Sequence, residues 1–400
     1  MTREVTGSLG SDQVSRRDLM KRIGAVAAAA ATLAPRIAAG QNAPARPATP
    51  PSTVTNPPRD FSPGAPPVTY PDPDVLTIDP MFNSYRLGNT ALVRLWTGAL
   101  WAEGPAWSSQ GRYLVWSDIP NNRQLRWLED NGQVTVFRMP SNNSNGNTFD
   151  FQGRQLSCEH LTRRVVRYEH DGTVTIIADA YQTKHFNSPN DIVAHPDGSI
   201  WFTDPPFGDQ LYEGGSDAPG GPGNQTGHLR SRVGQPAEAG VFKRESPTNV
   251  YRVDPSGRVD VAIAETDLPA PPNGLAFPPD YKKLYVVSQG NLYAFDVGTN
   301  NKPANRKLFT DFMVDGVKCG TDGVRVDVDG NLWCASNAGR NLGYSGVTVW
   351  TPEGKLIGRI RLPEACANLT FGGPKRNRLF MTASQSLYAV YLATQGAAPA

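Results

Sequence analysis

The sequence predicts an all-β fold and, within that class, a six-bladed β-propeller. Two observations lead to this prediction. First, at six places a polar residue stands eight residues before a turn position, and a hydrophobic run follows each turn. Second, glycine and proline are frequent, with 39 and 35 residues, and no long stretch has the 3.6-residue period of an amphipathic helix. The six polar residues are Glu103, Asn145, Asn190, Asn273, Asp322 and Asn368.

The spacing of these six residues is that of a propeller repeat. They are separated by 42, 45, 83, 49 and 46 residues. A period in the forties with two or more strands per unit is typical of a propeller blade. Six such residues therefore predict six blades. The hydrophobic runs after the turns read YLVWSD, QLSCEH, SIWFTD, KLYVVS, NLWCAS and RLFMTAS.

The third unit shows the pattern most clearly. An alternating run at 190–194 meets the turn sequence His-Pro-Asp-Gly at 195–198, and a second run at 199–204 returns. Two such runs around a Pro-Asp-Gly turn indicate an antiparallel hairpin. Because antiparallel strands return to their starting level, Asn190 and Asp204 are expected at the same end of the hairpin.

The ring is expected to close through a strand from the N-terminal side. The last unit supplies only three strand-like runs, at 368–371, 378–383 and 386–392, and one further run at 92–96 precedes the first unit. Pairing that N-terminal strand with the last blade would remove the blade's open edge.

Residues 1–40 have the features of a twin-arginine signal peptide. Ser-Arg-Arg-Asp-Leu-Met-Lys at 15–21 precedes a weakly apolar, alanine-rich run, and small residues follow at 38–40. Pro35 and Arg36 break this run well short of the roughly 20 residues that a bilayer needs, so no stable membrane span is expected. We expect the twin-arginine machinery to export the folded precursor to the periplasm or beyond.

The rest of the chain divides into a linker and one domain. Residues 41–80 are rich in Pro, Ala, Ser and Thr, which predicts a flexible linker, and the propeller is expected at 81–394. The net charge of +2, with no basic run after the signal, argues against nucleic acid or an acidic membrane surface as a partner. Nothing in the sequence demands a dimer, so a monomer is expected.

The interval of 83 residues contains a Gly/Pro-rich insertion at 205–240. It leaves the hairpin at the end that carries Asn190 and Asp204, so it is expected to lie over this face. Long loops in compact domains are functional or disordered. The insertion is therefore interpreted either as a lid or specificity loop, or as a flexible surface insertion without a function.

The innermost strands of a propeller run along its channel, so the six polar residues are expected to form a ring. All six carry a side-chain oxygen, and two of them are carboxylates. This mixture suits a hard divalent cation, first Ca²⁺ and then Mg²⁺ or Mn²⁺; Zn²⁺ is possible but disfavoured, because the ring lacks His and Cys. The alternative is that Asn and Asp open strands because they favour turns. Six of them in register are hard to attribute to turn chemistry alone.

The sequence also resembles the SMP-30/gluconolactonase/luciferin-regenerating-enzyme (LRE)-like family of six-bladed propellers, in its bacterial gluconolactonase type. The resemblance covers roughly residues 92–392. The matching motifs are EGPAW at 103–107, SPND at 188–191, FTDPPFG at 202–208, PNGL at 272–275, TDGV at 321–324 and ANLTFGG at 367–373.

The resemblance implies a metal site and a catalytic residue. One divalent ion, usually Ca²⁺, would be bound by Glu103, Asn190, Asn273 and Asp322. Asp322 would also be the acid/base. Asn145 and Asn368 have no such role in the family and are expected to line the channel.

Such a site suits hydrolysis of a lactone. A cation with open positions polarises a carbonyl, and a carboxylate can carry a proton from water to the departing ring oxygen. The prediction is divalent-metal-dependent hydrolysis of a sugar lactone such as gluconolactone. The alternatives are an organophosphate or aryl-ester hydrolase that uses the same metal, and a non-enzymatic propeller in which Ca²⁺ has only a structural role.

Polar residues near the ends of the second strands are expected at the same face. Together with Asn145 of the ring, His160, Asp204 and Ser288 are predicted to contact substrate. His160 either relays protons or donates to substrate hydroxyls, or it is satisfied by Glu159 or the backbone. Asp204 either orients Asn190 or accepts hydrogen bonds at the following turn.

The four cysteines contain no C-x-x-C motif. Cys158 and Cys334 lie in predicted strands and are expected to be buried small hydrophobes. A bridge between Cys319 and Cys366 is conceivable, because both precede ring residues in adjacent blades.

Overall fold

The computed structural model describes residues 59–62, 65, 68–209, 244–341 and 343–398. The predicted signal peptide and most of the predicted insertion lie outside these residues. The described chain is almost entirely β-structure, and none of its helices is long and apolar enough to cross a membrane. Its described helical elements are short 3₁₀ turns: η1 (Pro80–Ser84), η2 (Pro206–Asp209) and η4 (Glu265–Asp267).

Six antiparallel sheets of four or five strands make up the blades, and the predicted all-β, six-bladed fold is confirmed. From the innermost strand outward, the first three blades are β3 (Ala102–Ser108), β4 (Tyr113–Asp118), β5 (Arg123–Leu128), β6 (Val134–Arg138); β7 (Ser144–Phe149), β8 (Gln155–Glu159), β9 (Arg164–Tyr168), β10 (Val174–Ala178); and β13 (Ile192–Ala194), β14 (Ile200–Thr203), β15 (Val250–Val253), β16 (Val259–Ile263).

The other three blades follow the same order. They are β17 (Pro272–Ala276), β18 (Lys283–Ser288), β19 (Asn291–Val297), β20 (Pro303–Thr310); β23 (Gly320–Val326), β24 (Leu332–Asn337), β25 (Gly346–Trp350), β26 (Leu356–Arg361), β1 (Val75–Thr77); and β27 (Cys366–Gly372), β28 (Arg378–Ala383), β29 (Ser386–Tyr391), β2 (Val93–Thr97). Two small hairpins, β11 (Ala180–Tyr181) with β12 (Lys184–His185) and β21 (Met313–Val314) with β22 (Val317–Lys318), lie outside the blades.

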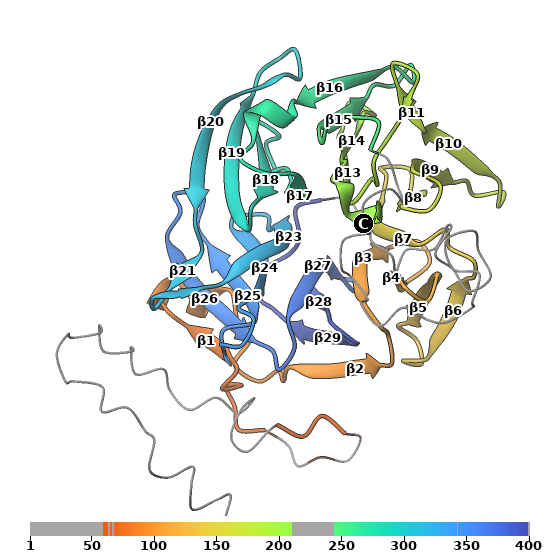
Figure 1. Ribbon diagram of the computed structural model, residues 1–400. Coiled ribbons are helices and arrows are strands. Elements are labelled where there is room, and N and C mark those ends of the chain that lie inside the picture. The colour runs from red at the N-terminus through yellow and green to blue at the C-terminus, as the bar shows by residue number, and fades with distance from the viewer. Residues whose placement is uncertain (1–58, 63–64, 66–67, 210–243, 342, 399–400) are drawn as a thin grey trace, which may run out of the picture. The chain divides into compact units, whose positions relative to one another are not determined.

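The innermost strands form a continuous ring. Each of β3, β7, β13, β17, β23 and β27 contacts the innermost strand of the next blade, and β27 returns to β3. Figure 1 shows these six strands grouped around a common centre. The start of each innermost strand therefore faces the starts of the other five across the channel.

An N-terminal strand completes the last blade. β2 pairs antiparallel with β29, with Val93 opposite Ala389 and Thr97 opposite Ser386. This is the pairing expected from the lone strand-like run before the first unit. It leaves the sixth blade with four strands, as in the first four blades.

The hairpin of the third blade shows why the repeat folds as it does. Gly198 has a φ of 85°, a conformation that glycine adopts without strain, and its N–H donates to the carbonyl of His195 at 2.9 Å. Asp197 accepts a hydrogen bond from the backbone of Ser199 at 2.8 Å. At the other end, the Asn190 N–H donates to the Thr203 carbonyl at 2.8 Å, so Asn190 and Asp204 lie at the same level.

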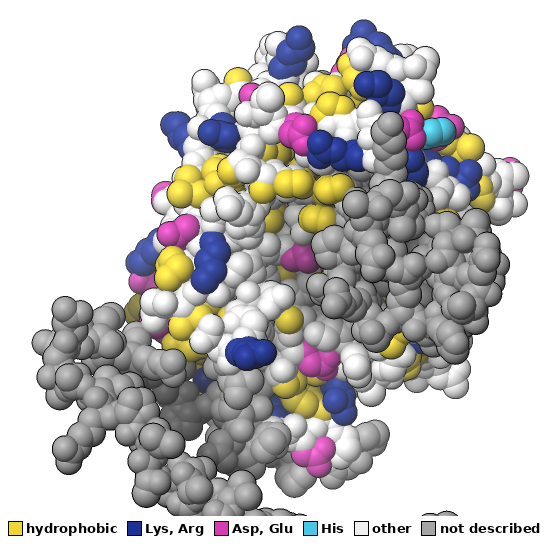
Figure 2. All heavy atoms as spheres, in the orientation of Figure 1, with side chains coloured by type: hydrophobic (Ala, Val, Ile, Leu, Met, Phe, Trp, Pro, Cys, Tyr) yellow, Lys and Arg dark blue, Asp and Glu magenta, His cyan; other side chains and the backbone are white. Residues whose placement is uncertain are grey.

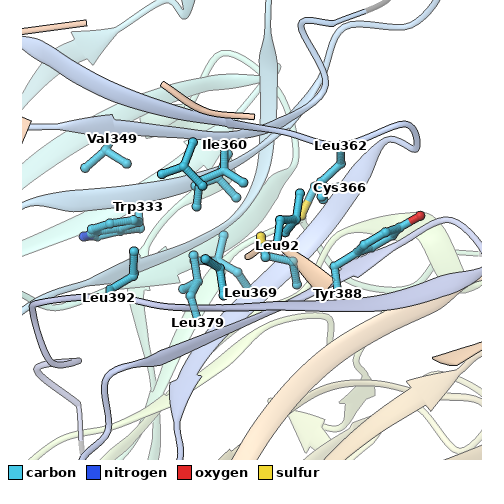
Figure 3. Packing of buried hydrophobic residues seen from close by; sticks show 14 of the residues in the cluster. Leu92, Trp333, Val349, Ile360, Leu362, Cys366, Leu369, Leu379, Tyr388 and Leu392 are labelled. Atoms are coloured by element: carbon cyan, nitrogen blue, oxygen red, sulfur yellow. The ribbon is translucent and has the colours of Figure 1, made fainter. Parts of the chain in front are cut away.

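Hydrophobic side chains fill the space between neighbouring blades. Figure 3 shows the cluster between the fifth and sixth blades, where Trp333 and Ile360 meet Leu369 and Leu379. All four side chains are buried. Alternating strand residues supply such side chains, so the pattern that predicts the strands also supplies the core.

The prediction of a flexible linker at 41–80 is wrong for the residues of this range that the structure describes. The side chain of Arg59 is only 6% exposed and pairs with Asp72 at 2.8 Å and Asp74 at 3.1 Å. Asp74 also pairs with the buried Arg361 of β26 at 3.1 Å, and β1 extends the fifth blade as its outermost strand. This segment is held mainly by buried charges and strand pairing. The sequence analysis did not detect its order because the segment contains few apolar residues.

The C-terminal segment crosses the end of the channel opposite the polar ring. Ala397 donates its N–H to the Val326 carbonyl at 2.9 Å, and Arg376 donates to the Gly396 carbonyl at 2.7 Å. These residues help to line a small cavity of about 30 Å³ that also contacts Arg325. The folded chain therefore continues beyond the predicted boundary at 394.

Charges of both signs are interspersed on the face shown in Figure 2. The described chain also forms exposed ion pairs, such as Lys283 with Asp296 at 2.8 Å and Arg258 with Asp260 at 3.0 Å. Such pairs contribute little stability, but they prevent one sign of charge from dominating.

All four cysteines are buried free thiols. The bridge between Cys319 and Cys366 is therefore not formed. Cys158 and Cys334 are the buried small side chains that the sequence predicts.

Candidate active site

The six polar residues of the sequence repeat stand at or just before the start of the six innermost strands. Four of them are buried, whereas Asn273 and Asp322 are partly exposed. Asn273 and Asp322 lie in the wall of a cavity of about 530 Å³. The buried members are Glu103, Asn145, Asn190 and Asn368.

Glycine follows four of the six ring residues and allows the innermost strands to approach each other closely. A Cβ at Gly104 would overlap the Asn145 carbonyl oxygen, and a Cβ at Gly146 would overlap that of Asn190. Any other residue would have to push the backbone of the next blade outward. The remaining two cases are Gly274 beside Asp322 and Gly323 beside Asn368.

Hydrogen bonds also connect neighbouring innermost strands of the ring. The Gly146 N–H donates to the Asn190 carbonyl at 2.8 Å, and the Leu275 N–H donates to the Asp191 carboxylate at 3.4 Å. The side chain of Asn368 bonds to Glu103. The structure therefore brings the four predicted ligands, Glu103, Asn190, Asn273 and Asp322, to one ring.

The two ring carboxylates lie in an environment that disfavours negative charge. Burial, followed by the nearby Asp322 carboxylate, raises the pKa of Glu103 well above its ordinary value. Burial, followed by the carboxylate of Asp191, raises the pKa of Asp322 to about 7. Glu103, Asp322 and Asp191 therefore lie within electrostatic reach of one another, and a bound cation would offset their repulsion.

The oxygen of Asn273 provides an independent test of a cation site. The side chain of Asn273 hydrogen-bonds to Asp322, yet its buried Oδ1 accepts no hydrogen bond within the described chain. Buried acceptors are rarely left without a partner, and an amide oxygen beside two carboxylates suits a hard cation. The residues fit such an ion. The described chain contains no group of three or more His, Cys, Asp or Glu side chains that could hold a metal. The predicted site is of a different kind, because only two of its four ligands are carboxylates and the other two are Asn side chains.

The cavity opens along one half of the ring. Its walls come from the fourth, fifth and sixth blades and from the loop that precedes β3. An aromatic side chain, two hydroxyls and an amide supplement Asn273 and Asp322. These additional groups are Trp101, Thr321, Ser384 and Asn337.

Two of the four predicted substrate contacts instead hold loops in place. Both Asp204 and Ser288 are fully buried. Asp204 accepts the N–H groups of Asn187 and Ser188, each at 2.9 Å, and so fixes the segment that leads to Asn190. Ser288 donates to the carbonyl of Ala270 at 2.7 Å.

The other two predicted contacts also lie outside the walls of this cavity. Asn145 and His160 are buried in the second blade. The carbonyl of Asn145 accepts a hydrogen bond from Ser117 at 2.7 Å. The backbone N–H of His160 donates to Asn143 at 3.3 Å.

Asp118 shows how loop anchoring shapes the cavity. This residue ends β4, and its carboxylate accepts the N–H groups of Leu100 at 3.0 Å and Trp101 at 3.3 Å. Both loop residues line the cavity. Polar residues at the ends of the second strands, such as Asp118, thus position the loops. The sequence signal that could have identified Trp101 was its place in the motif W-A-E-G-P.

Sequence reasoning missed one ion pair beside the ring. The carboxylate of Asp191 binds the guanidinium of Arg325 at 3.2 Å and accepts the N–H groups of Ile192 at 3.0 Å and Leu275 at 3.4 Å. Asp191 and Arg325 are buried. The signal available was the S-P-N-D motif, whose last residue occupies a position that is glycine in four other blades.

Comparisons with known proteins agree with this architecture. The gluconolactonase of Zymomonas mobilis is 29% identical over 324 residues, which cover 74% of this chain and 80% of the relative. The 6-deoxy-6-sulfogluconolactonase of Pseudomonas putida is 25% identical over 297 residues, 71% of this chain and 83% of the relative. A solved gluconolactonase structure from Xanthomonas campestris has 33% identity and a TM-score of 0.65, and the match covers 83% of this chain and 99% of that chain.

The match to a family model spans most of the ring. The model for the SMP-30/gluconolactonase/LRE-like region matches residues 101–385. These residues run from the loop before β3 to the turn before β29, so they contain all six innermost strands. The chain therefore belongs to the SMP-30/gluconolactonase/LRE-like family.

Proposed function

We propose that this protein is a lactonase that hydrolyses a sugar lactone, such as gluconolactone, to its hydroxy acid. The observation that carries the proposal is the placement of Asp322 in the wall of a 530 Å³ cavity, beside the acceptor oxygen of Asn273 and close to Glu103. The names of the relatives support the substrate class, since two are gluconolactonases and one is a 6-deoxy-6-sulfogluconolactonase.

Glu103, Asn190, Asn273 and Asp322 would hold a divalent cation, with Ca²⁺ favoured by the all-oxygen ligand set. When bound, such an ion polarises the lactone carbonyl and offsets the negative charge that develops on its oxygen. Cys366 also lines the cavity, but its thiol is a poor additional ligand, because burial raises the pKa of Cys366 well above its ordinary value. This is a further reason to favour Ca²⁺ over Zn²⁺.

The proton transfers fall to Asp322. Water attacks the carbonyl carbon, and Asp322 accepts the proton that this water loses. The bond between the carbonyl carbon and the ring oxygen then breaks, and Asp322 returns the proton to the departing oxygen. The side chain of Asn273 hydrogen-bonds to Asp322 and so fixes the orientation of the carboxylate.

The walls of the cavity suit a polyhydroxylated ring. Trp101 offers a flat apolar surface, while Ser384 and Asn337 offer groups that can exchange hydrogen bonds with hydroxyls. The loop that carries Trp101 is held by the buried Asp118. The cavity thus combines an apolar face with polar partners, as sugar recognition requires.

A pH-stat assay of the purified protein tests the proposal. Gluconolactone, a pentonolactone, a phenyl ester and an organophosphate would be compared, each after removal of divalent cations and again with Ca²⁺. We expect turnover of the lactones only with the cation. Faster turnover of the phenyl ester or the organophosphate would overturn the substrate assignment.

The Asp322→Asn variant tests the catalytic residue. It should fold but lose about 100-fold or more of the turnover, the usual range for loss of a general acid/base. Asp254→Asn is the matched control, because Asp254 lies in the turn between β15 and β16 and bonds to Ser256 and Arg258. Full activity of Asp322→Asn would exclude Asp322 as acid/base.

We also propose that the twin-arginine sequence at 15–21 directs export. Replacing Arg16 and Arg17 by lysine should leave the protein in the cytoplasmic fraction of cells, whereas the unaltered precursor should reach the periplasm. Equal distribution of the two proteins between the fractions would refute this assignment.

A further inference from the structure

The buried pair of Asp191 and Arg325 connects strands that carry three of the four predicted cation ligands. Asp191 directly follows Asn190 at the start of the third blade. Its carboxylate accepts the N–H of Leu275, two residues after Asn273, at 3.4 Å. It also binds Arg325, three residues after Asp322, at 3.2 and 3.4 Å. One carboxylate therefore connects the third, fourth and fifth blades at the level of the ring.

The Asp191 carboxylate lies within electrostatic reach of both ring carboxylates. The negative charge of Asp191 contributes to the raised pKa of Glu103 and of Asp322. Arg325 extends from this level to the small cavity at the opposite end of the channel, where it contributes to the wall. Arg325 thus contacts Asp191 at the ring and also lines the cavity beside the C-terminal segment.

The charges of these four residues give a simple count. Glu103, Asp322 and Asp191 carry three negative charges when ionised, and the bound Arg325 carries one positive charge. The group therefore has a net charge of minus two, which matches a divalent cation. Without Arg325 the same group would carry minus three.

We propose that Arg325 is the counter-ion that sets the charge of the ring site and makes it selective for divalent over trivalent cations, with Asp191 as the residue that positions it. This inference rests on the proposed cation site. Neither residue needs to touch the cation or the substrate. Both act through the field at the ring and through the placement of Asn190, Asn273 and Asp322.

The physical reason is that the attraction between a cation and the site scales with the charge of the cation. Removing the positive charge of Arg325 favours every cation, but it favours a trivalent ion more than a divalent one. Removing the negative charge of Asp191 does the reverse. Removing both restores minus two, so the selectivity should return even where the absolute affinity does not.

Calorimetric titration with Ca²⁺ and with Tb³⁺ tests the proposal without any measurement of activity. The proteins are the wild type, Arg325→Met, Asp191→Asn and the double variant, each freed of divalent cations. We expect the ratio of Tb³⁺ to Ca²⁺ affinity to rise about tenfold in Arg325→Met and to fall about tenfold in Asp191→Asn. The double variant should return to the wild-type ratio.

Arg361→Met is the matched control, because Arg361 forms a similarly buried pair with Asp74 at 3.1 Å outside the ring. It should leave the ratio unchanged, and Arg325→Lys, which keeps the charge, should also keep the ratio. Should one single variant fail to fold, the other still tests whether charge sets the ratio, because its ratio is expected to move away from the wild-type value.

The outcomes separate this inference from the proposed function. A wild-type protein that binds neither ion would overturn both. A wild type that binds Ca²⁺, together with ratios that do not change in Arg325→Met and Asp191→Asn, would overturn only the role of Arg325. Ratios that shift in the same direction in both single variants would show a general structural effect and would likewise refute it.

Discussion

Without its divalent cation, the protein should become less stable as the pH rises from about 4 to about 7. Asp322 is the reason, because its pKa is about 7 in the folded, cation-free protein and its ordinary value is 3.8. Between these values Asp322 is protonated in the folded state and ionised in the unfolded state. The folded state then binds one more proton, so the free energy of unfolding falls as pH rises and levels off above the folded pKa.

The size of the effect follows from the two pKa values. The change from 3.8 to about 7 corresponds to about 4 kcal/mol, at 1.36 kcal/mol per pKa unit. Glu103 acts in the same direction, because its pKa is also raised by burial and by Asp322. A bound cation needs both carboxylates ionised and stabilises that form, so saturating Ca²⁺ should abolish the part of the loss that Asp322 and Glu103 cause.

Urea unfolding followed by circular dichroism measures this effect. The cation-free protein and the Ca²⁺-saturated protein would be compared at several pH values between about 5 and about 8. The Asp322→Asn variant removes one of the titrating groups, so its pH dependence should be smaller than that of the wild type by about 4 kcal/mol. The Asp204→Asn variant is the control, because Asp204 also has a pKa of about 7 but fixes the loop at Asn187 and does not belong to the predicted ligands.

Two results would refute the reasoning. One is a cation-free protein whose stability rises or stays constant over this pH range. The other is an Asp322→Asn variant with the same pH dependence as the wild type, which would place the titrating groups elsewhere. In Asp204→Asn the stabilisation by Ca²⁺ should persist, since that residue lies outside the proposed ligand set.

Three further predictions concern single side chains. Glu103→Gln removes one of the two ligand charges and should weaken Ca²⁺ binding at least about tenfold by calorimetry; unchanged affinity would remove Glu103 from the ligand set. Gly274→Ala forces a methyl group against the Asp322 carbonyl and should cost about 1–3 kcal/mol in urea unfolding, whereas Gly88→Ala, with nothing within 4 Å, should cost little. Phe82→Ala empties a fully buried position against Trp333 and should cost about 3–5 kcal/mol; a loss below about 1 kcal/mol would show that η1 adds little to the fold.

The architecture could be predicted because its signals are local and repeated. Each blade places a ring residue, a turn and a hydrophobic strand at fixed offsets, so six weak signals reinforce one another. Closure was predictable for a different reason, since a blade with three strands has an open edge and only the run at 92–96 was left to cover it. The outer boundaries were not predictable in this way. Arg59 and Asp72 hold the N-terminal segment through charge, and a search for apolar residues does not detect them.

The substrate contacts were harder to predict, because a side-chain oxygen does not reveal whether its hydrogen bonds are already used. Asp204 and Ser288 lie at the correct end of their blades, but both bond to the backbone of their own blade. Asp118 does the same and thereby positions Trp101. Distinguishing an anchor from a substrate contact requires the path of the preceding loop, which the repeat pattern does not specify.

The residue that follows each ring residue carries information that the ring residues themselves do not. Glycine stands there in four blades, because the innermost strands approach so closely that a side chain would meet the next backbone. The two exceptions need a reason. Leu369 packs into the core between the fifth and sixth blades, as a strand residue of an ordinary sheet does. Asp191 instead places a charge where the other blades place none, and it needs Arg325 from two blades away to offset that charge. A buried, paired charge at a position where the other blades have glycine or a packed leucine indicates a requirement other than packing. At this position the geometry supports control of the charge at the ring as that requirement.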